Sequence, residues 1–196
     1  MFLADQGANV IRIVKPDEAA SSTHYKELPE QQYRLLNRNK KLLTLNLKTQ
    51  EGKKQALSLI ERADVVIENF RPGVMKRLGL DYPSVKTNNP GLVYLSLPGF
   101  ASTDKERCHI QAWEGILGAA SGMYVDVSYV RQLLNFPPLY TSLPVNSIFG
   151  SVHGVIAVMA ALLAREDRGL GALIEIPLVE AGMTGFVHRF SFSKIL

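Results

Sequence analysis

Short apolar runs alternate with segments of helical pattern along this chain, and this alternation limits its fold more than any other feature. Five runs have the length and composition of strands: NVIRIV at 9–14, KLLTLNL at 41–47, ADVVIENF at 63–70, GLVYLSL at 91–97 and LIEIPL at 173–178. Strands that alternate with helices, several of them apolar on both faces, are typical of a parallel sheet covered by helices. The sequence therefore predicts an α/β fold.

Helix signals separate these runs. Residues 1–6 have the pattern of a helix end closed by Gly7, and Thr49 is a good N-cap for a following helix. Further helices are expected at 72–78, at 112–124, from about 147 to 166 with glycines after it, and from 179 to the end. Residues 15–36 are polar and predict a long surface excursion, and 125–143 predict a second loop.

The composition indicates a well-packed globular chain. Of 196 residues, 46% are hydrophobic and 20% are charged, and the formal net charge is +4. The basic residues are dispersed, which suits a small polyanionic ligand better than nucleic acid. The longest apolar stretch, 152–164, is shorter than the roughly 20 residues of a membrane span, and Cys108 is the only cysteine. We therefore expect a cytoplasmic or organelle-matrix protein with no membrane span, disulfide or metal site.

The ENFRPG segment at 68–73 is the clearest candidate for a binding site from the residues alone. It places an amide, an aromatic ring and a guanidinium at the end of a predicted strand, and open parallel sheets bind ligands at their strand ends. The alternative is a strand end followed by an ordinary Pro-Gly turn. Both interpretations remain open at this point.

Four segments carry a resemblance to a known family. They are LADQGANVIRI, LNRNKKLLTLNLKTQEGKK, ADVVIENFRPGVMKRLGLDY and ALLAREDRGLGALIEIPLVEA. Together, in order and over nearly the whole chain, they resemble the signatures of the family III CoA-transferases, whose fold is shared by the α-methylacyl-CoA racemases. The resemblance implies a Rossmann-like large domain that handles acyl-coenzyme A thioesters, with a carboxylic acid as the second substrate.

The resemblance also implies which residues contact coenzyme A. Positions that match the family's CoA contacts are Lys15, Leu45, Lys48, Asn69, Phe70 and Arg77. Lys48 and Arg77 would face phosphates, since cationic side chains suit them, and Leu45 and Phe70 would line the nucleotide or pantetheine path. Each residue also has a plain structural alternative: a solvated basic side chain or an ordinary core residue. Lys15 matches less well because IRIVKPDE departs from the usual pattern.

The position that matches the family's nucleophile carries an amide. In the family, an aspartate before the apolar helix forms the covalent acyl and CoA intermediates. Counting back from AALLARE at 160–166 reaches Asn146 with racemase spacing, or Val145 with transferase spacing, and neither is a carboxylate. We interpret Asn146 as the N-cap of the helix. The alternative is a retained polar contact to the thioester.

A racemase would need a histidine and an aspartate to exchange the proton next to the thioester. His109 matches the racemase histidine, but the aspartate partner is again missing. His153 fits a core position on its helix. The spacing of Asp104 and Asp126 gives no indication that either carboxylate acts as the acid or base. The racemase interpretation is therefore the weakest of the three considered.

We expect residues 1–196 to form the N-terminal part of the family's large domain, without its first strand and its C-terminal half. The resemblance implies a longer protein whose two copies interlock as a homodimer. The leading hypothesis is a CoA-transferase family member that binds acyl-CoA. The alternative is a non-catalytic binding or dimerisation half of a tandem protein, in which the other half supplies the aspartate.

Overall fold

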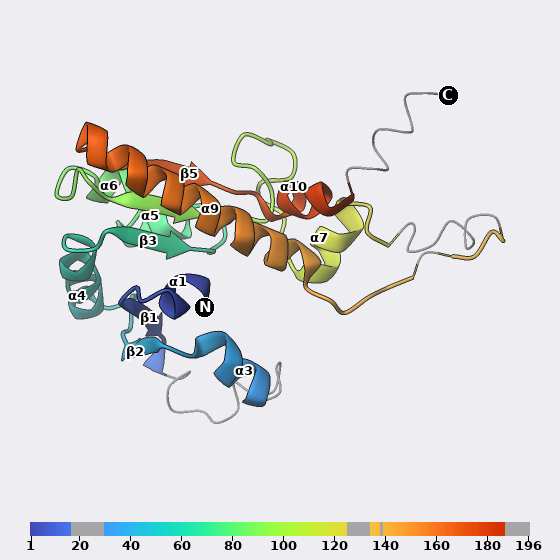
Figure 1. Cartoon of the computed structure of the whole chain (residues 1–196), viewed down its shortest axis with the longest axis horizontal. Helices are drawn as coiled ribbons and strands as arrows, with labels where there is room; N and C mark the ends of the chain where they lie inside the picture. The colour runs from blue at the N-terminus through green and yellow to red at the C-terminus, as the bar shows by residue number, and fades with distance from the viewer. Residues whose placement is uncertain (17–29, 125–133, 138, 187–196) are drawn as a thin grey trace.

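The computed structural model describes residues 1–16, 30–124, 134–137 and 139–186 (Figure 1). Its helices are α1 (Phe2–Asp5), α3 (Glu30–Asn37), α4 (Gln50–Ile60), α5 (Val74–Leu78), α6 (Tyr82–Val85), α7 (Glu114–Ala120), α9 (Val145–Arg168), α10 (Leu178–Met183) and the 3₁₀ turn η2 (Thr184–Phe186). Its strands are β1 (Val10–Val14), β2 (Lys40–Thr44), β3 (Val65–Glu68), β4 (Val93–Ser96) and β5 (Leu173–Glu175). Of the loop predicted at 125–143, residues 134–137 and 139–143 are described and contain no helix or strand, and the rest lies outside the described residues.

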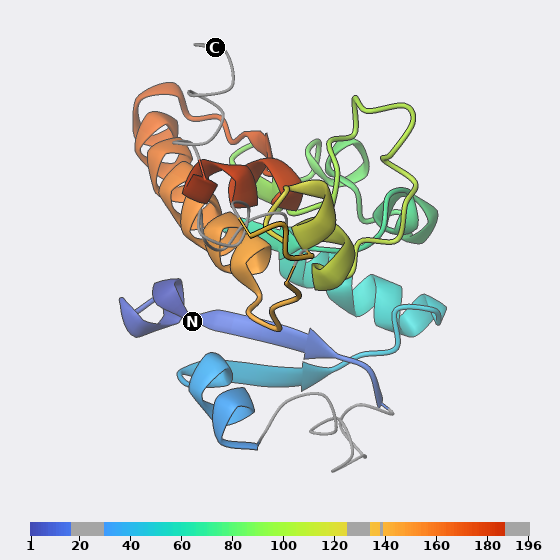
Figure 2. The same cartoon turned by 90° about the vertical axis from the view of Figure 1, so that its right-hand side faces the viewer.

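The strand pairs are parallel, which confirms the α/β prediction, but the strands form two separate sheets. β1 pairs with β2, and β3, β4 and β5 pair in that order. The β1–β2 pair lies apart from the larger sheet in both views (Figures 1 and 2). The apolar composition of NVIRIV is typical of a buried strand, but Ile11 and Ile13 of β1 are exposed, because among the described elements β1 makes extensive contact only with β2 and no helix covers the face that carries them.

The core is built on the two faces of β4. Val93 and Leu95 pack with Val158 of α9 on one face. Tyr94 points to the other face, where it packs with a cluster contributed mainly by α4, α6 and the segments beside them. This alternation follows from the two-residue period of a strand. β4 is thus covered on both sides by helices, as the sequence predicts.

α9 covers one face of the larger sheet through its small residues. A Cβ added to Gly154 would lie 2.9 Å from Leu95, and one added to Gly150 would lie 2.4 Å from Leu178 of α10, so both glycines permit close packing. By length and composition alone this 24-residue helix could cross a membrane. Because it packs on β4 and α10, one of its faces is a core face in this structure, while Ile148, Ile156 and Leu163 remain exposed on another.

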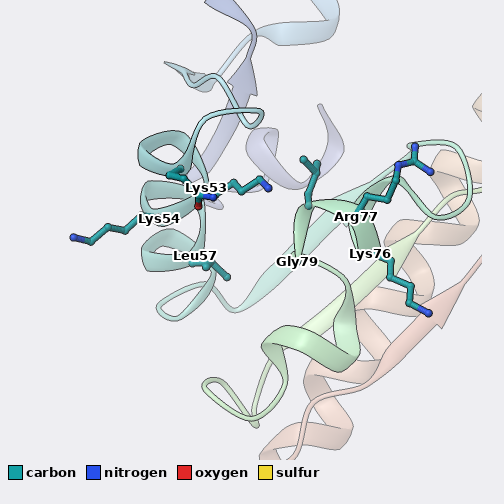
Figure 3. A pocket seen from close by; sticks show the side chains of 8 residues that line it. Lys53, Lys54, Leu57, Lys76, Arg77 and Gly79 are labelled. Atoms are coloured by element: carbon teal, nitrogen blue, oxygen red, sulfur yellow. The ribbon is translucent and has the colours of Figure 1, made fainter.

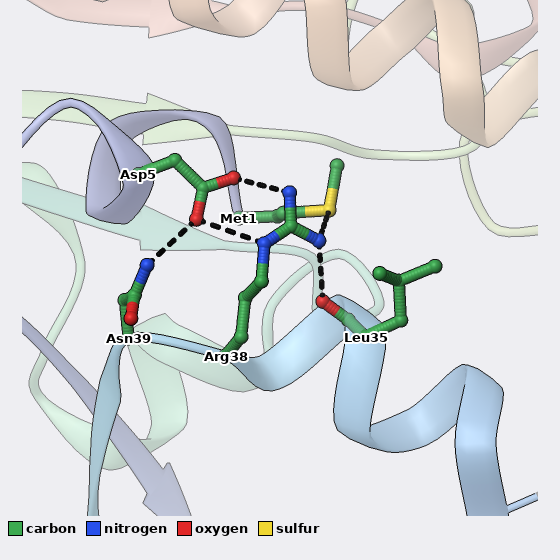
Figure 4. Close-up of polar contacts among 5 residues, drawn as sticks. All are labelled: Met1, Asp5, Leu35, Arg38 and Asn39. Carbon is green, nitrogen blue, oxygen red and sulfur yellow. Dashed lines mark hydrogen bonds and ion pairs between the residues drawn. The ribbon is translucent and has the colours of Figure 1, made fainter.

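Residues 30–37 form a helix, which corrects the prediction of an irregular excursion through 36. The i,i+4 pair of Arg34 with Glu30 favours this helix, and an acidic first turn complements its dipole. Just after α3, Arg38 donates to both carboxylate oxygens of Asp5, at 3.1 and 2.5 Å, and Asn39 donates to Asp5 at 3.0 Å (Figure 4). These contacts tie α1 to the start of β2.

Candidate functional site

The turn between β2 and α4 presents Lys48 on a tightly bonded loop. The Asn46 side chain accepts the Lys48 N–H at 3.0 Å, and Thr49 donates its hydroxyl to the Asn46 carbonyl at 2.8 Å. The Thr49 oxygen also accepts the Gly52 N–H at 3.1 Å, which confirms the predicted N-cap. A Cβ on Gly52 would lie 2.1 Å from the Asn46 carbonyl oxygen, so this position requires glycine. Lys48 is exposed at the end of this turn.

The turn after β3 presents Asn69 and Phe70 in the same manner. Glu68, the last residue of β3, accepts the Phe70 N–H at 2.8 Å and also accepts the Ser96 hydroxyl of the neighbouring strand. The turn is therefore held to the sheet through one carboxylate. Asn69 is exposed and Phe70 is 41% exposed.

α5 lies between two glycines in the left-handed region, Gly73 at φ 77° and Gly79 at φ 71°. These glycines lie at the two ends of the short helix that carries Arg77. Between α4 and α5 lies an open cavity of about 470 Å³, lined by Gln50, Lys53, Lys54, Leu57, Lys76, Arg77, Leu78 and Gly79. Its rim therefore carries four cationic side chains, and among the described residues none of the four forms an ion pair.

The four cationic side chains point in different directions (Figure 3). Lys53 extends from α4 toward α5, whereas Lys54 points away from it. Lys76 and Arg77 extend from the opposite side of α5. The region is thus a broad, electropositive surface, and Lys53 is the cation directed into the gap between the helices.

The remaining predicted CoA contacts have different surroundings. Lys15 is exposed directly after β1. Leu45 is only 5% exposed and belongs to the core cluster with Ala56 and Ile60. Its side chain therefore fills the core, and its N–H is bonded to the Val14 carbonyl at 3.0 Å.

The amino end of α9 corrects the interpretation of Asn146 as an N-cap. Pro144 occupies the N-cap position, and Asn146 lies inside the first turn. The cap is supplied from another helix: a Glu114 carboxylate oxygen of α7 accepts the N–H of Asn146 at 2.8 Å and that of Ser147 at 3.4 Å. The other oxygen accepts the Ser147 hydroxyl at 2.6 Å. Glu114 thus bonds the unpaired N–H groups of the first turn, where a negative charge is favoured.

Asn146 is fully buried, at 0% exposure. Its Nδ2 donates to Glu114 at 3.3 Å, and its Oδ1 has no hydrogen-bond partner among the described residues. That oxygen lies against Gly182 of α10, where an added Cβ would be 1.8 Å from it. The position that matches the family's nucleophile is therefore covered by protein in this structure.

The other candidate acid–base residues are dispersed. His109 is exposed in a turn-rich segment, and His153 lies beside Phe149 on α9 with ring centroids 6.4 Å apart. Backbone N–H donation from Arg107 lowers the pKa of Asp104, and Arg107 also forms an ion pair with it at 2.6 Å. Asp126 lies outside the described residues. Within the described ranges, no group of three or more His, Cys, Asp or Glu side chains could hold a metal ion.

Sequence reasoning missed Glu114, Ser147 and Gly182. Glu114 has one local signal, an acidic residue in the first turn of a helix, but that signal points to its own helix α7. The contact with Asn146 joins residues 32 positions apart and depends on how α7 packs against α9.

The parallel α/β fold agrees with the comparisons with known proteins. The family model described as CoA-transferase family III matches residues 1–191. A crystal structure of a hypothetical protein (Rv3272) from Mycobacterium tuberculosis superposes with a TM-score of 0.85 at 26% identity, covering 97% of this chain and 53% of that one. A CAIB/BAIF family protein from Brucella suis superposes with a TM-score of 0.82 at 28% identity, over 93% and 49%. The chain belongs to CoA-transferase family III.

Curated relatives support the same family assignment. The chain is 42% identical over 189 residues to the CoA-transferase/lyase DddD of Marinomonas sp. (strain MWYL1), which covers 96% of this chain and 22% of that protein. It is 31% identical over 183 residues to the formyl-CoA:oxalate CoA-transferase of Streptomyces avermitilis, over 92% of this chain and 43% of that protein. The chain thus spans less than half the length of these two relatives.

Proposed function

We propose that this chain binds the coenzyme A part of an acyl-CoA in a protein that moves CoA between carboxylic acids, and that residues 1–196 do not themselves carry the acyl group. The observation that carries the proposal is the contrast between two kinds of position. Lys48, Asn69, Phe70 and Arg77 are exposed on firmly bonded turns or a short helix, whereas Asn146 is a buried amide.

The exposed side chains suit the chemistry of coenzyme A. Its phosphates favour cations without an ion-pair partner, as at Arg77 and Lys53. Its adenine or pantetheine arm favours an exposed aromatic surface such as Phe70. Lys15 and Lys48 add positive charge near the ends of β1 and β2, where parallel sheets bind ligands. Leu45 would support this surface from beneath as a core residue.

A tandem arrangement is favoured by one comparison. About the same number of aligned residues covers 22% of the DddD protein but 43% of the formyl-CoA:oxalate CoA-transferase, so DddD is roughly twice as long. We infer that this chain corresponds to part of one half of such a protein, in which a second family domain supplies the carboxylate. An interlocked pair of copies and a location in the cytoplasm or an organelle matrix remain part of the proposal.

The binding part of the proposal is tested by calorimetry with CoA on the protein that contains this chain. We expect CoA to bind with an affinity that falls as salt rises, because phosphate contacts are electrostatic. Arg77→Ala should weaken binding, and Lys86→Ala should not, since Lys86 lies outside the cavity beside Tyr82. Absence of CoA binding at low salt would contradict the proposed function.

A further inference from the structure

We infer that Glu68 is the positioning residue of the turn proposed to bind CoA, and that it holds Asn69 and Phe70 through an anchor on the neighbouring strand. Glu68 is the last residue of β3, and its two carboxylate oxygens accept different hydrogen bonds. Oε2 accepts the Phe70 N–H at 2.8 Å, and Oε1 accepts the Ser96 hydroxyl of β4. This inference rests on the proposed function, because it concerns how the proposed CoA contacts are held.

The carboxylate bonds the chain just beyond the end of the sheet. The Glu68 carbonyl still accepts the Leu97 N–H at 2.9 Å, beside the end of β4, and the Val74 N–H donates to the Arg71 carbonyl at 3.1 Å where α5 begins. The bond from the Glu68 side chain to Phe70 lies in the interval between these two. A side chain that bonds the N–H two residues on limits the backbone between them. It therefore fixes the directions in which the side chains of residues 69 and 70 project.

The negative charge of Glu68 is unfavourable beside a polyanion. Glu68 is half-buried, and within the described ranges it forms no ion pair. Val66, on the same face of β3, packs in the cluster that Met75 of α5 also joins, so the carboxylate is on the side of the sheet that α5 covers. A carboxylate there repels the phosphates of CoA. Its contribution to binding is therefore its two acceptor oxygens, against the effect of its charge.

A second carboxylate at the same edge of the sheet provides a matched control. Ser96 of β4 lies opposite Glu68 in β3 and opposite Glu175 in β5. Glu175 accepts the Ser102 N–H at 2.8 Å and so holds the loop that follows β4. The two carboxylates thus make the same kind of bond to a loop N–H. They differ in that the turn held by Glu68 carries proposed CoA contacts and the loop held by Glu175 does not.

Substitutions at Glu68 separate its hydrogen bonds from its charge. Glu68→Ala removes both bonds, so Asn69 and Phe70 must be ordered when CoA binds, and the affinity should fall about tenfold. Glu68→Gln can keep its Oε1 on the Phe70 N–H and donate its amide to the Ser96 oxygen. Its affinity for CoA should equal or exceed that of wild type, because a repelling charge is lost. Glu175→Ala should not weaken CoA binding.

The test is calorimetry with CoA at low salt on the protein that contains this chain, with chemical unfolding to show that each variant is folded. Wild type that binds CoA while Glu68→Ala binds equally well would overturn the inference alone, and so would an equal loss of affinity in Glu68→Gln. If Glu68→Ala does not fold, Ser96→Ala decides, because it frees one carboxylate oxygen: unchanged affinity there would overturn the inference. Failure of wild type to bind CoA would contradict the proposed function and the inference with it.

Discussion

The proposed CoA-binding turns and the amino end of α9 are organised in opposite ways. At the ends of β2 and β3, the local hydrogen bonds of Asn46, Thr49 and Glu68 hold short turns, and the side chains that we propose contact CoA are exposed to solvent. At the amino end of α9, Asn146 points inward and is held by Glu114 and Gly182 from other helices. The first region, which we propose binds CoA, is held by local bonds, whereas the second is closed by packing.

This difference shows that exposed turns and a buried helix terminus within one fold depend on different contacts. A binding turn built from neighbouring residues stays intact when a distant helix changes. A reactive position at a helix terminus depends on the elements packed around it, here α7 and α10. Substitutions in the two regions should therefore affect different quantities, stability in the second and ligand affinity in the first.

The largest effect is expected for Gly182→Ala. The added Cβ would lie 1.8 Å from Oδ1 and 2.6 Å from Cγ of Asn146, so α10 or α9 must shift, at a cost of about 3 kcal/mol in unfolding free energy. Gly115→Ala in α7 is the matched control, because its added Cβ would lie at ordinary contact distance, 3.8 Å, from the Tyr140 ring. Chemical unfolding should give a lower unfolding free energy for Gly182→Ala than for Gly115→Ala. Equal stability of both variants would mean that the end of α9 is not closely packed.

The next effect is on ligand affinity. Lys48→Ala should weaken CoA binding by about 1–3 kcal/mol if the ammonium group bonds a phosphate, with the unfolding free energy unchanged because the side chain is exposed. Calorimetry at low salt measures the first quantity and chemical unfolding the second. Lys41→Ala, on exposed β2, controls for the loss of one positive charge. An unchanged affinity would remove Lys48 from the site.

The smallest effect tests the local bonds that position the binding turn. Thr49→Ala removes the N-cap of α4 and the bond to the Asn46 carbonyl, and should cost about 1 kcal/mol of stability. It should also weaken CoA binding slightly, because Lys48 loses part of its support. Thr103→Ala, an exposed turn residue, is the control. Lower stability with fully retained affinity would show that the Lys48 turn does not need this cap.

The sequence predicted the features that depend on neighbouring residues. The Thr49 cap, the Gly169 helix end at φ 68° and the apolar strands follow from local patterns, and the structure confirms them. The pairing of Glu114 with Asn146 was not predictable, because two helices bring together residues far apart in the chain. The exposure of Ile11 and Ile13 on β1 was also missed, since an apolar run does not show whether a helix covers the face of the strand.

The most direct test of the account is covalent trapping with acyl-CoA. The protein that contains this chain is incubated with acyl-CoA, treated with hydroxylamine or borohydride, and mapped by mass spectrometry. We expect CoA to bind but no acyl or CoA adduct to form within residues 1–196, because an amide at 146 cannot form the anhydride. An adduct outside these residues would support the tandem arrangement. An adduct on Glu114, Asp104 or Asp126 would contradict the account by revealing a nucleophile within this chain.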